Sequence, residues 1–158
     1  IPIEEGAGKM RAALAARQDP NLLIAGRTGA PRITGIEDTL ARARAYEKAG
    51  VDAIFLVGIK TRGELEAVAP SIGVPIILGT IGPELRDLDY LAGQGVRIAL
   101  QGHQPIMAAV QAVHATLKAL REGTPPEELE GLPGGDLMKQ VTRDADARRW
   151  REDFLGGG

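Results

Sequence analysis

Four short apolar runs recur along the first two-thirds of the chain, and none has the in–out alternation of a half-buried strand. They are Leu22–Ala25, Ala53–Val57, Ile76–Leu78 and Ile98–Leu100. Continuous apolar runs of this length are typical of strands covered on both faces, as in parallel sheets. Successive runs lie about 20–30 residues apart, which leaves room for one crossover helix in each unit. The pattern therefore predicts an α/β fold built from parallel βα units.

Helical segments are predicted around and between these runs. They cover approximately Glu4–Arg17, Gly35–Ala49, Arg62–Ala69, Pro83–Ala92 and Pro105–Arg121. Two of them open on a threonine three residues before a glutamate, Thr34 before Glu37 and Thr61 before Glu64, and this spacing predicts a capping box. Gly50 follows the second helix, where a left-handed residue often ends a helix. The predicted order is one helix and then four βα units.

The character of the sequence changes after Arg121. Residues 122–135 read EGTPPEELEGLPGG and are predicted to form a linker, so we expect three parts: residues 1–121, the linker 122–135, and a helical segment 136–158. The last segment carries Trp150 and Phe154 among many charges. Apolar side chains of this size need a surface to pack on, either the chain's own domain or a partner subunit.

Composition excludes several classes of function. The formal net charge of −2 and the pI near 5.7 argue against a nucleic-acid partner. No apolar run approaches the roughly 20 residues of a membrane span, so no membrane partner is expected. The chain has no cysteine, which excludes disulfides and thiolate metal ligands and fits a cytoplasmic location. Its first residue is Ile and not Met, which suggests a fragment or a processed product.

Polar residues follow the apolar runs, at the ends where ligands bind in parallel α/β proteins. After the first run come Arg27 and Thr28, after the third comes Thr80, and after the fourth come Gln101 and His103. Because the carboxyl ends of parallel strands meet at one edge, we expect these side chains to converge. The set favours a site for a small anion.

Two of these residues carry the candidate chemistry. The planar guanidinium of Arg27 suits a carboxylate or phosphate, although a structural ion pair with a nearby acid is an equal alternative. His103 can donate a hydrogen bond or move a proton, but it could equally cap the following helix. His114 lies off the apolar stripe of that helix and is predicted to be exposed. No acid lies at the rim, since Asp52 precedes a strand, and no metal ligand is predicted in this chain.

Several segments together resemble the isocitrate lyase/phosphoenolpyruvate mutase superfamily. IAGRTGA (residues 24–30) resembles an ARTDA strand end, and ARARAYEKAGVDAIFLVG (residues 41–58) is similar to a helix and the strand after it. EEGAGKMRAALAAR (residues 4–17) resembles the segment that follows the mobile catalytic loop. LAGQGVRIALQGHQPIMAAVQAV (residues 91–113) is similar to the final strand and helix. The resemblance covers nearly the whole chain.

The resemblance is greatest to the oxaloacetate decarboxylase-like branch. Val57 stands where lyases and mutases of the superfamily usually have Glu, and a His after the last strand, as in Gly102-His103, is a mark of that branch. The resemblance implies that Arg27 and His103 bind substrate. Thr28, Thr80 and Gln101 are then candidates for a second layer around it. Two features depart from the pattern. Gly29 replaces an acid, and the end of the third run, which tends to be aromatic in the branch, reads GTIG here, with Thr80 and Ile81.

The resemblance also implies an eight-stranded β/α barrel, of which these four strands would be the second half, followed by an extra C-terminal helix. In the family, Mg²⁺ binds the 2-oxo acid and stabilises the enolate left by departing CO₂. The resemblance implies decarboxylation of oxaloacetate to pyruvate, with the Mg²⁺ ligands in the other half and little activity in this chain alone. It further implies a homodimer or homotetramer in which the C-terminal helix is swapped between subunits.

Two alternatives to decarboxylation stay open. The first keeps the superfamily and changes the reaction, to 2-methylisocitrate lyase-like carbon–carbon cleavage, phosphonopyruvate hydrolysis or phosphoenolpyruvate mutation. The second is a half-barrel without catalysis that assembles with another chain or binds an anion. The absence of an acidic metal cluster from the sequence favours this second alternative.

Overall fold

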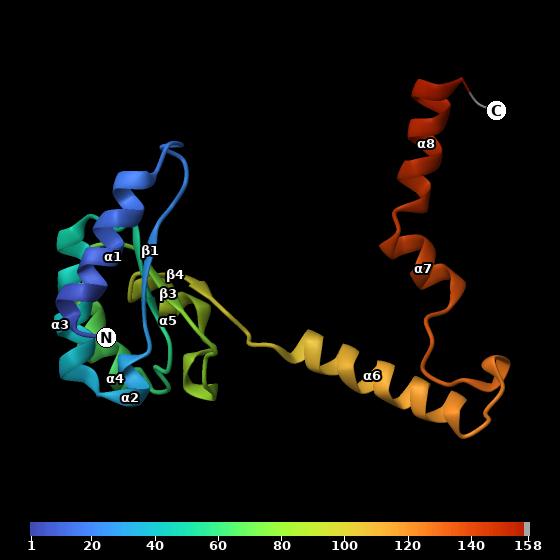
Figure 1. Cartoon of the computed structure of the whole chain (residues 1–158), viewed down its shortest axis with the longest axis horizontal. Coiled ribbons are helices and arrows are strands. Elements are labelled where there is room, and N and C mark those ends of the chain that lie inside the picture. The colour runs from blue at the N-terminus through green and yellow to red at the C-terminus, as the bar shows by residue number, and fades with distance from the viewer. Residues whose placement is uncertain (157–158) are drawn as a thin grey trace. The chain divides into compact units, whose positions relative to one another are not determined.

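The computed structural model describes residues 1–156 and divides into two compact units, residues 1–103 and the residues from 104 on. The first unit is an α/β sandwich (Figure 1). Its helices are α1 (Ile3–Ala16), α2 (Ala30–Ile33), α3 (Ile36–Ala49), α4 (Arg62–Val68) and α5 (Leu88–Gly93), with short 3₁₀ turns η1 (Ala69–Ser71) and η2 (Pro83–Leu85). Its strands are β1 (Ala25–Thr28), β2 (Ala53–Leu56), β3 (Ile76–Leu78) and β4 (Val96–Ala99).

The four strands form one parallel sheet whose order, β1-β2-β3-β4, is the order of the chain. This confirms the prediction of four parallel βα units. One face of the sheet packs on the helices and holds the core. Its fully or almost fully buried side chains include Ile54, Leu56, Ile76, Leu78 and Val96.

The other face of the sheet, called the open face below, carries Arg27, Phe55, Ile77 and Ile98. These four residues are register partners from one strand to the next, so their side chains project to the same side. All four are half-buried or exposed, and Ile98 is 49% exposed. The open face is therefore where the sheet can meet a ligand.

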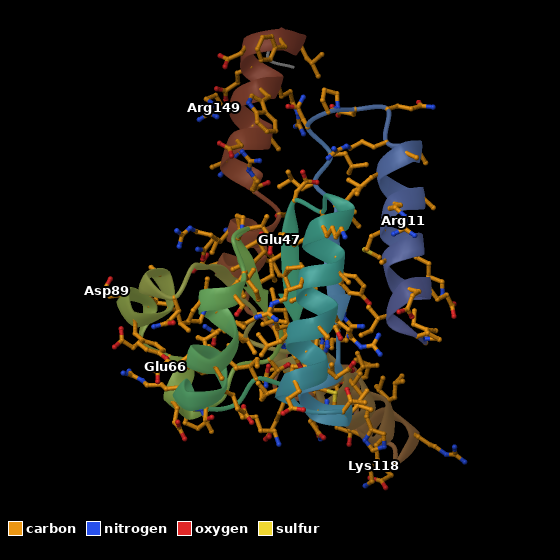
Figure 2. All side chains as sticks on the ribbon, turned by 90° about the vertical axis from the view of Figure 1, so that its left-hand side faces the viewer. Arg11, Glu47, Glu66, Asp89, Lys118 and Arg149 are labelled. Carbon is orange, nitrogen blue, oxygen red and sulfur yellow. The ribbon has the colours of Figure 1, made fainter. Side chains whose placement is uncertain are left out.

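The helical layer is seen face on in Figure 2, where α3, with Glu47, lies between α1, with Arg11, and α4, with Glu66. Tyr46 of α3 fixes the distance between α1 and β1. A Cβ atom on Gly6 of α1 would lie 2.5 Å from the Tyr46 hydroxyl, and a Cβ on Gly26 of β1 would lie 2.9 Å from its ring. Only glycine fits at both positions, so the ring is held between the helix and the strand.

The first strand begins later than its apolar run predicts. Sheet pairing starts at Ala25, opposite Ala53, and Leu22 and Leu23 lie outside it with 56% and 74% exposure. The carboxylate of Asp52 accepts a hydrogen bond from the Ile24 amide at 2.8 Å, which ties the chain down just before the strand. Arg27 is consequently a strand residue and does not follow the strand.

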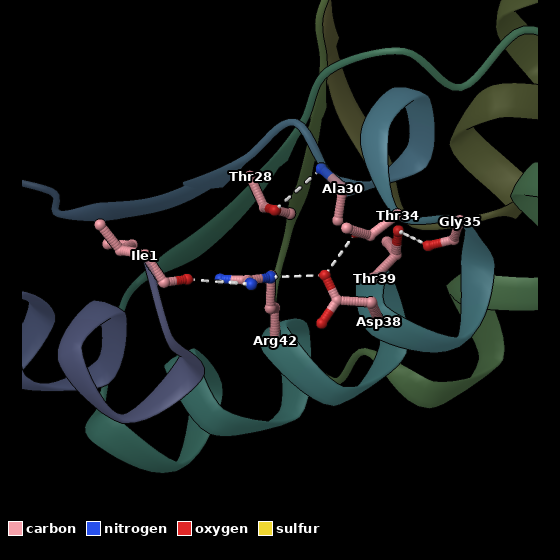
Figure 3. A network of polar contacts seen from close by, with 8 residues as sticks. All are labelled: Ile1, Thr28, Ala30, Thr34, Gly35, Asp38, Thr39 and Arg42. Atoms are coloured by element: carbon pink, nitrogen blue, oxygen red, sulfur yellow. Dashed lines mark hydrogen bonds and ion pairs between the residues drawn. The ribbon is translucent and has the colours of Figure 1, made fainter.

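The two predicted capping boxes have different outcomes. At α4, Thr61 and Glu64 form the reciprocal box as predicted. At α3 the prediction is wrong, because Gly35, with φ of 94°, is the residue before the helix and displaces Thr34 from the capping position. The Thr34 hydroxyl donates instead to the carboxylate of Asp38 (Figure 3).

The Asp38 carboxylate also accepts from Arg42 at 2.7 Å, and this bond is the main cause that lowers the pKa of Asp38. The predicted fourth helix is also different, since it divides into η2 and α5. Asp87 lies between them and caps α5 by accepting from the Tyr90 amide at 3.0 Å.

The second unit contains α6 (Gln104–Arg121), η3 (Pro126–Glu128), α7 (Gly135–Val141) and α8 (Asp144–Leu155). The single C-terminal helix that was predicted is two helices, separated at Arg143, which adopts left-handed φ and ψ of 55° and 41°. Arg143 pairs with Asp146 and stacks on Trp150, so its side chain belongs to the start of α8. His114 is exposed on α6, as predicted. Among residues 1–156, no helix is both long and apolar enough to cross a membrane.

Candidate functional site

A cleft of about 370 Å³ lies at the carboxyl ends of the strands, within the first unit. Four residues predicted from the sequence line it together, namely Arg27, Thr80, Gln101 and His103. They come from four separate places in the chain, and the parallel sheet brings them to one edge. The remaining lining residues are Phe55, Val57, Gly79, Leu100 and Gly102.

Arg27 enters the cleft from the open face of β1. Its guanidinium carbon lies 5.6 Å from the centroid of the Phe55 ring on the neighbouring strand. Within residues 1–156, Arg27 has no ion pair and no side-chain hydrogen bond. The alternative of a structural ion pair is therefore not supported in this chain, and the five N–H donors of the fork are available to a ligand.

His103 reaches the same cleft from the end of β4. The ladder continues past the strands, since the Leu100 amide donates to Leu78 at 3.0 Å and the Ile81 amide donates to Leu100 at 3.4 Å. These bonds fix the segments that carry Thr80 and Gln101. Gly102 follows with φ of 94°, a conformation that favours glycine, and turns the chain so that His103 lines the cleft.

The wall between the two ends of the cleft is apolar. Val57 and Gly79 pack closely there, because a Cβ atom on Gly79 would lie 3.2 Å from Val57 Cγ2 and 3.3 Å from its Cα. A larger residue than glycine would push the ends of β2 and β3 apart. Phe55 and Leu100 complete the wall, and Leu100 is 44% exposed. A polar ligand would therefore be held at its ends and packed along its middle.

Thr28 is the one predicted site residue that lies elsewhere. It is buried on the helix side of β1, and its hydroxyl accepts a hydrogen bond from the Ala30 amide at 3.1 Å (Figure 3). That bond closes the turn from β1 into α2. Thr28 does not line the cleft that holds Arg27 and His103.

Phe55 and Leu100 line the cleft but were not predicted as site residues from the sequence. The predicted residues are the polar ones that follow each apolar run, whereas these two lie inside the runs. Strand alternation offered a signal for Phe55, because the parallel register places it beside Arg27 on the same face. Leu100 ends its run directly before Gln101.

The cleft carries positive charge and no acid. None of its lining residues is Asp or Glu, and no cluster of His, Cys, Asp and Glu within residues 1–156 has the geometry of a metal site. Asp52 lies before β2, as expected, and its carboxylate accepts from Ile24 and from Arg17, the latter at 2.9 Å. The bond from the Ile24 amide is the main cause that lowers the pKa of Asp52. The charge distribution suits an anionic ligand.

The fold and the cleft define this chain as a β/α protein of the barrel type, with a cleft at the carboxyl ends of its parallel strands. Comparison with protein families gives the particular group. The family model described as phosphoenolpyruvate phosphomutase matches residues 1–121, and the chain belongs to that family.

Known proteins similar to this chain include two oxaloacetate decarboxylases. The one from Bradyrhizobium diazoefficiens is 59% identical over 156 residues, which are 99% of this chain and 54% of that protein. The one from Bradyrhizobium sp. strain ORS 278 is 53% identical, over all of this chain and 55% of that protein. The chain spans about half the length of the curated relatives it matches.

A solved structure of phosphonopyruvate hydrolase, described as a complex with oxalate and Mg²⁺, is also similar. Its TM-score is 0.74 at 33% identity, and the match covers 98% of this chain and 57% of that one. The match extends beyond the first unit, because it covers nearly the whole chain. The extra C-terminal helices therefore belong to the likeness as well as the βα units.

Proposed function

We propose that this chain supplies the substrate-binding half of a Mg²⁺-dependent lyase that decarboxylates oxaloacetate to pyruvate and CO₂. The observation that carries the proposal is the convergence of Arg27, without an acidic partner in this chain, and His103 in one cleft. The 59% identity to an oxaloacetate decarboxylase supports this choice of substrate.

The two residues act on opposite ends of a small 2-oxo acid. Arg27 binds a carboxylate through two parallel N–H···O bonds, which fix both the position and the plane of that group. The imidazole of His103 donates a hydrogen bond to an oxygen at the other end of the ligand. When the carbon–carbon bond to the departing carboxylate breaks, its electrons move toward the carbonyl oxygen as an enolate forms. This charge develops at the carbonyl oxygen in the middle of the ligand, and Arg27 and His103 hold the two ends in place while it does so.

The apolar wall has a separate task. Phe55, Val57 and Leu100 limit the access of water to the middle of the ligand, which strengthens the hydrogen bonds made at its ends. Thr80 and Gln101 lie on the rim, where an exposed hydroxyl and amide are available to orient the ligand.

Mg²⁺ is the metal expected for this activity, but residues 1–156 do not provide a group of ligands for it. We propose that its ligands lie outside this chain. We also propose that phosphonopyruvate hydrolysis is the second candidate activity, which the similarity to the hydrolase structure supports. If the protein catalyses neither oxaloacetate decarboxylation nor phosphonopyruvate hydrolysis, the remaining candidate is a half-barrel that binds an anion without catalysis.

The test uses a hybrid in which this chain replaces the matching segment of the Bradyrhizobium diazoefficiens oxaloacetate decarboxylase. We expect the hybrid to form pyruvate from oxaloacetate, and Arg27→Lys to lower kcat/KM by roughly 100-fold, because lysine keeps the charge and loses the fork. Arg11→Lys, exposed on α1, is the matched control and should leave activity unchanged. Wild-type turnover in Arg27→Lys would refute the clamp.

We further propose a homo-oligomer in which residues 136–158 pack on a neighbouring subunit. The described part of that segment exposes Trp150 at 44%, and Phe154 and Leu155 at 77% each. Side chains of this size and exposure are rarely left in water by a soluble protein. Exchange of an identical element between protomers covers them at low cost.

A further inference from the structure

We propose that Phe55 is the positioning residue of the site, and that its ring holds the guanidinium of Arg27 in the orientation that receives a carboxylate. The inference rests on the proposed role of Arg27 as the carboxylate clamp. It assigns to a residue in the middle of β2 a task in ligand binding, although its side chain has no polar atom.

The sheet register creates the pair. Arg27 and Phe55 are direct partners in the parallel β1–β2 ladder, so both side chains leave the sheet on the open face at the same height. The guanidinium carbon lies 5.6 Å from the ring centroid, within the distance at which an aromatic face attracts a cation. Both residues line the same cleft.

Within residues 1–156, the Arg27 guanidinium has this contact with the Phe55 ring but no ion pair and no side-chain hydrogen bond. Elsewhere in the first unit, arginines that lie near acids pair with them, as Arg17 does with Asp52 and Arg42 with Asp38. An acid beside Arg27 would occupy the N–H donors that a ligand needs. An aromatic face holds the cation from one side and leaves the donors at its edge unoccupied.

This arrangement prepares the site for its ligand. A long arginine side chain that moves freely loses conformational entropy when a carboxylate binds, and that loss weakens binding. A side chain that is already stacked on a ring has lost part of this entropy before the ligand arrives. Replacing Phe55 with an aliphatic residue should therefore weaken carboxylate binding without removing any group that touches the ligand's charge.

The test compares Phe55→Leu, which keeps apolar bulk, with Phe55→Tyr, which keeps the aromatic face, in the hybrid described above. Ile77→Val is the control. Ile77 lies on the same open face and is the register partner of Phe55 on β3, but it does not line the cleft. We expect Phe55→Leu to raise KM for oxaloacetate roughly 2- to 30-fold with a smaller change in kcat. Phe55→Tyr and Ile77→Val should stay close to wild type.

A double-mutant cycle separates positioning from general packing. If Phe55 acts through Arg27, adding Phe55→Leu to the Arg27→Lys protein should raise KM for oxaloacetate by less than about twofold. An equal loss in both backgrounds would overturn the inference, because the ring would then act independently of the guanidinium. A KM for Phe55→Leu that matches wild type would also overturn it.

A spectroscopic measurement tests the inference even if the hybrid does not turn over oxaloacetate. Nitrogen-15 relaxation of the Arg27 Nε–Hε group, assigned by its loss in Arg27→Lys, reports the mobility of the guanidinium directly. Greater mobility in Phe55→Leu, with restoration in Phe55→Tyr, supports the inference. Equal mobility in all three proteins overturns it. Absence of turnover in the unmutated hybrid is counted against the proposed function alone.

Discussion

The contact of Tyr46 with two glycines predicts that Gly→Ala substitutions at two neighbouring positions of α1 differ in their effect on stability. Gly6 and Gly8 both lie in α1, and changing either to alanine should favour the helix by about 1 kcal/mol. At Gly8 the new Cβ would have space, since its nearest neighbour is the Arg11 guanidinium at 3.7 Å. At Gly6 it would lie 2.5 Å from the Tyr46 hydroxyl.

The Tyr46 ring has no room to move away. It is 3% exposed, and Gly26 of β1 supports its other side, where an added Cβ would lie 2.9 Å from the ring. Overpacking of this kind costs about 1–3 kcal/mol. Gly6→Ala should therefore range from neutral to about 2 kcal/mol less stable than wild type, and Gly8→Ala should be about 1 kcal/mol more stable.

The assay is urea unfolding followed by far-UV circular dichroism, with the free energy of unfolding compared at constant m value. Tyr46→Phe provides a second check, because it removes the atom nearest to the added methyl group. In that background the cost of Gly6→Ala should be smaller. A Gly6→Ala protein as stable as Gly8→Ala would refute the account of the packing between α1, α3 and β1.

Three further outcomes are expected. The pKa of Asp52 is lowered in the fold, so its hydrogen bonds stabilise the fold above the ordinary pKa of 3.8 and are lost as pH falls through the lower folded value. The difference in Tm between wild type and Asp52→Asn should therefore shrink below about pH 4. A difference in Tm that stays constant with pH would contradict this. Thr61→Ala should lower stability by about 1 kcal/mol in urea unfolding, since it removes one half of the capping box with Glu64, and an unchanged midpoint would count against the box. Truncation after Gly135 should shift the mass seen by light scattering toward the monomer, whereas an unchanged oligomer mass would show that the last helices do not hold the subunits together.

The architecture of the first unit is predictable from the sequence because one simple pattern, an apolar run followed by a helical segment, recurs along it. Each apolar run stands between two helical segments, and the order of the runs becomes the order of the strands. The beginning of β1 is different because apolar character alone does not decide pairing. Leu22 and Leu23 are as apolar as any strand residue, yet the bond from Ile24 to Asp52 sets where pairing begins.

Local signals fail where a second residue competes for the same position. Thr34 has the spacing of a capping residue, but Gly35 adopts a conformation that places it before α3 instead. The break between α7 and α8 depends on the left-handed backbone of Arg143, a residue type that seldom adopts that conformation. Neither feature is visible in hydrophobic periodicity.

The polar part of the candidate site is predictable for the same reason as the fold. Arg27, Thr80, Gln101 and His103 converge because parallel strands end at one edge. The apolar part requires the register between strands, which is what places Phe55 under Arg27. Sequence patterns give the direction in which each strand residue points but not the neighbour it meets.

The strands lie in the sheet in the same order as in the chain, and this order affects how the sheet folds. Each strand pairs with the one before it, and the partners are about 20–30 residues apart, so each loop closure is short and costs little entropy. The sheet can grow in the order in which the ribosome releases the chain, with the last edge serving as the template for the next strand. Within residues 1–156, β1 and β4 each keep one unpaired edge. When this chain is present alone at high concentration, edge-to-edge association of two copies through these strands is the expected route to aggregation.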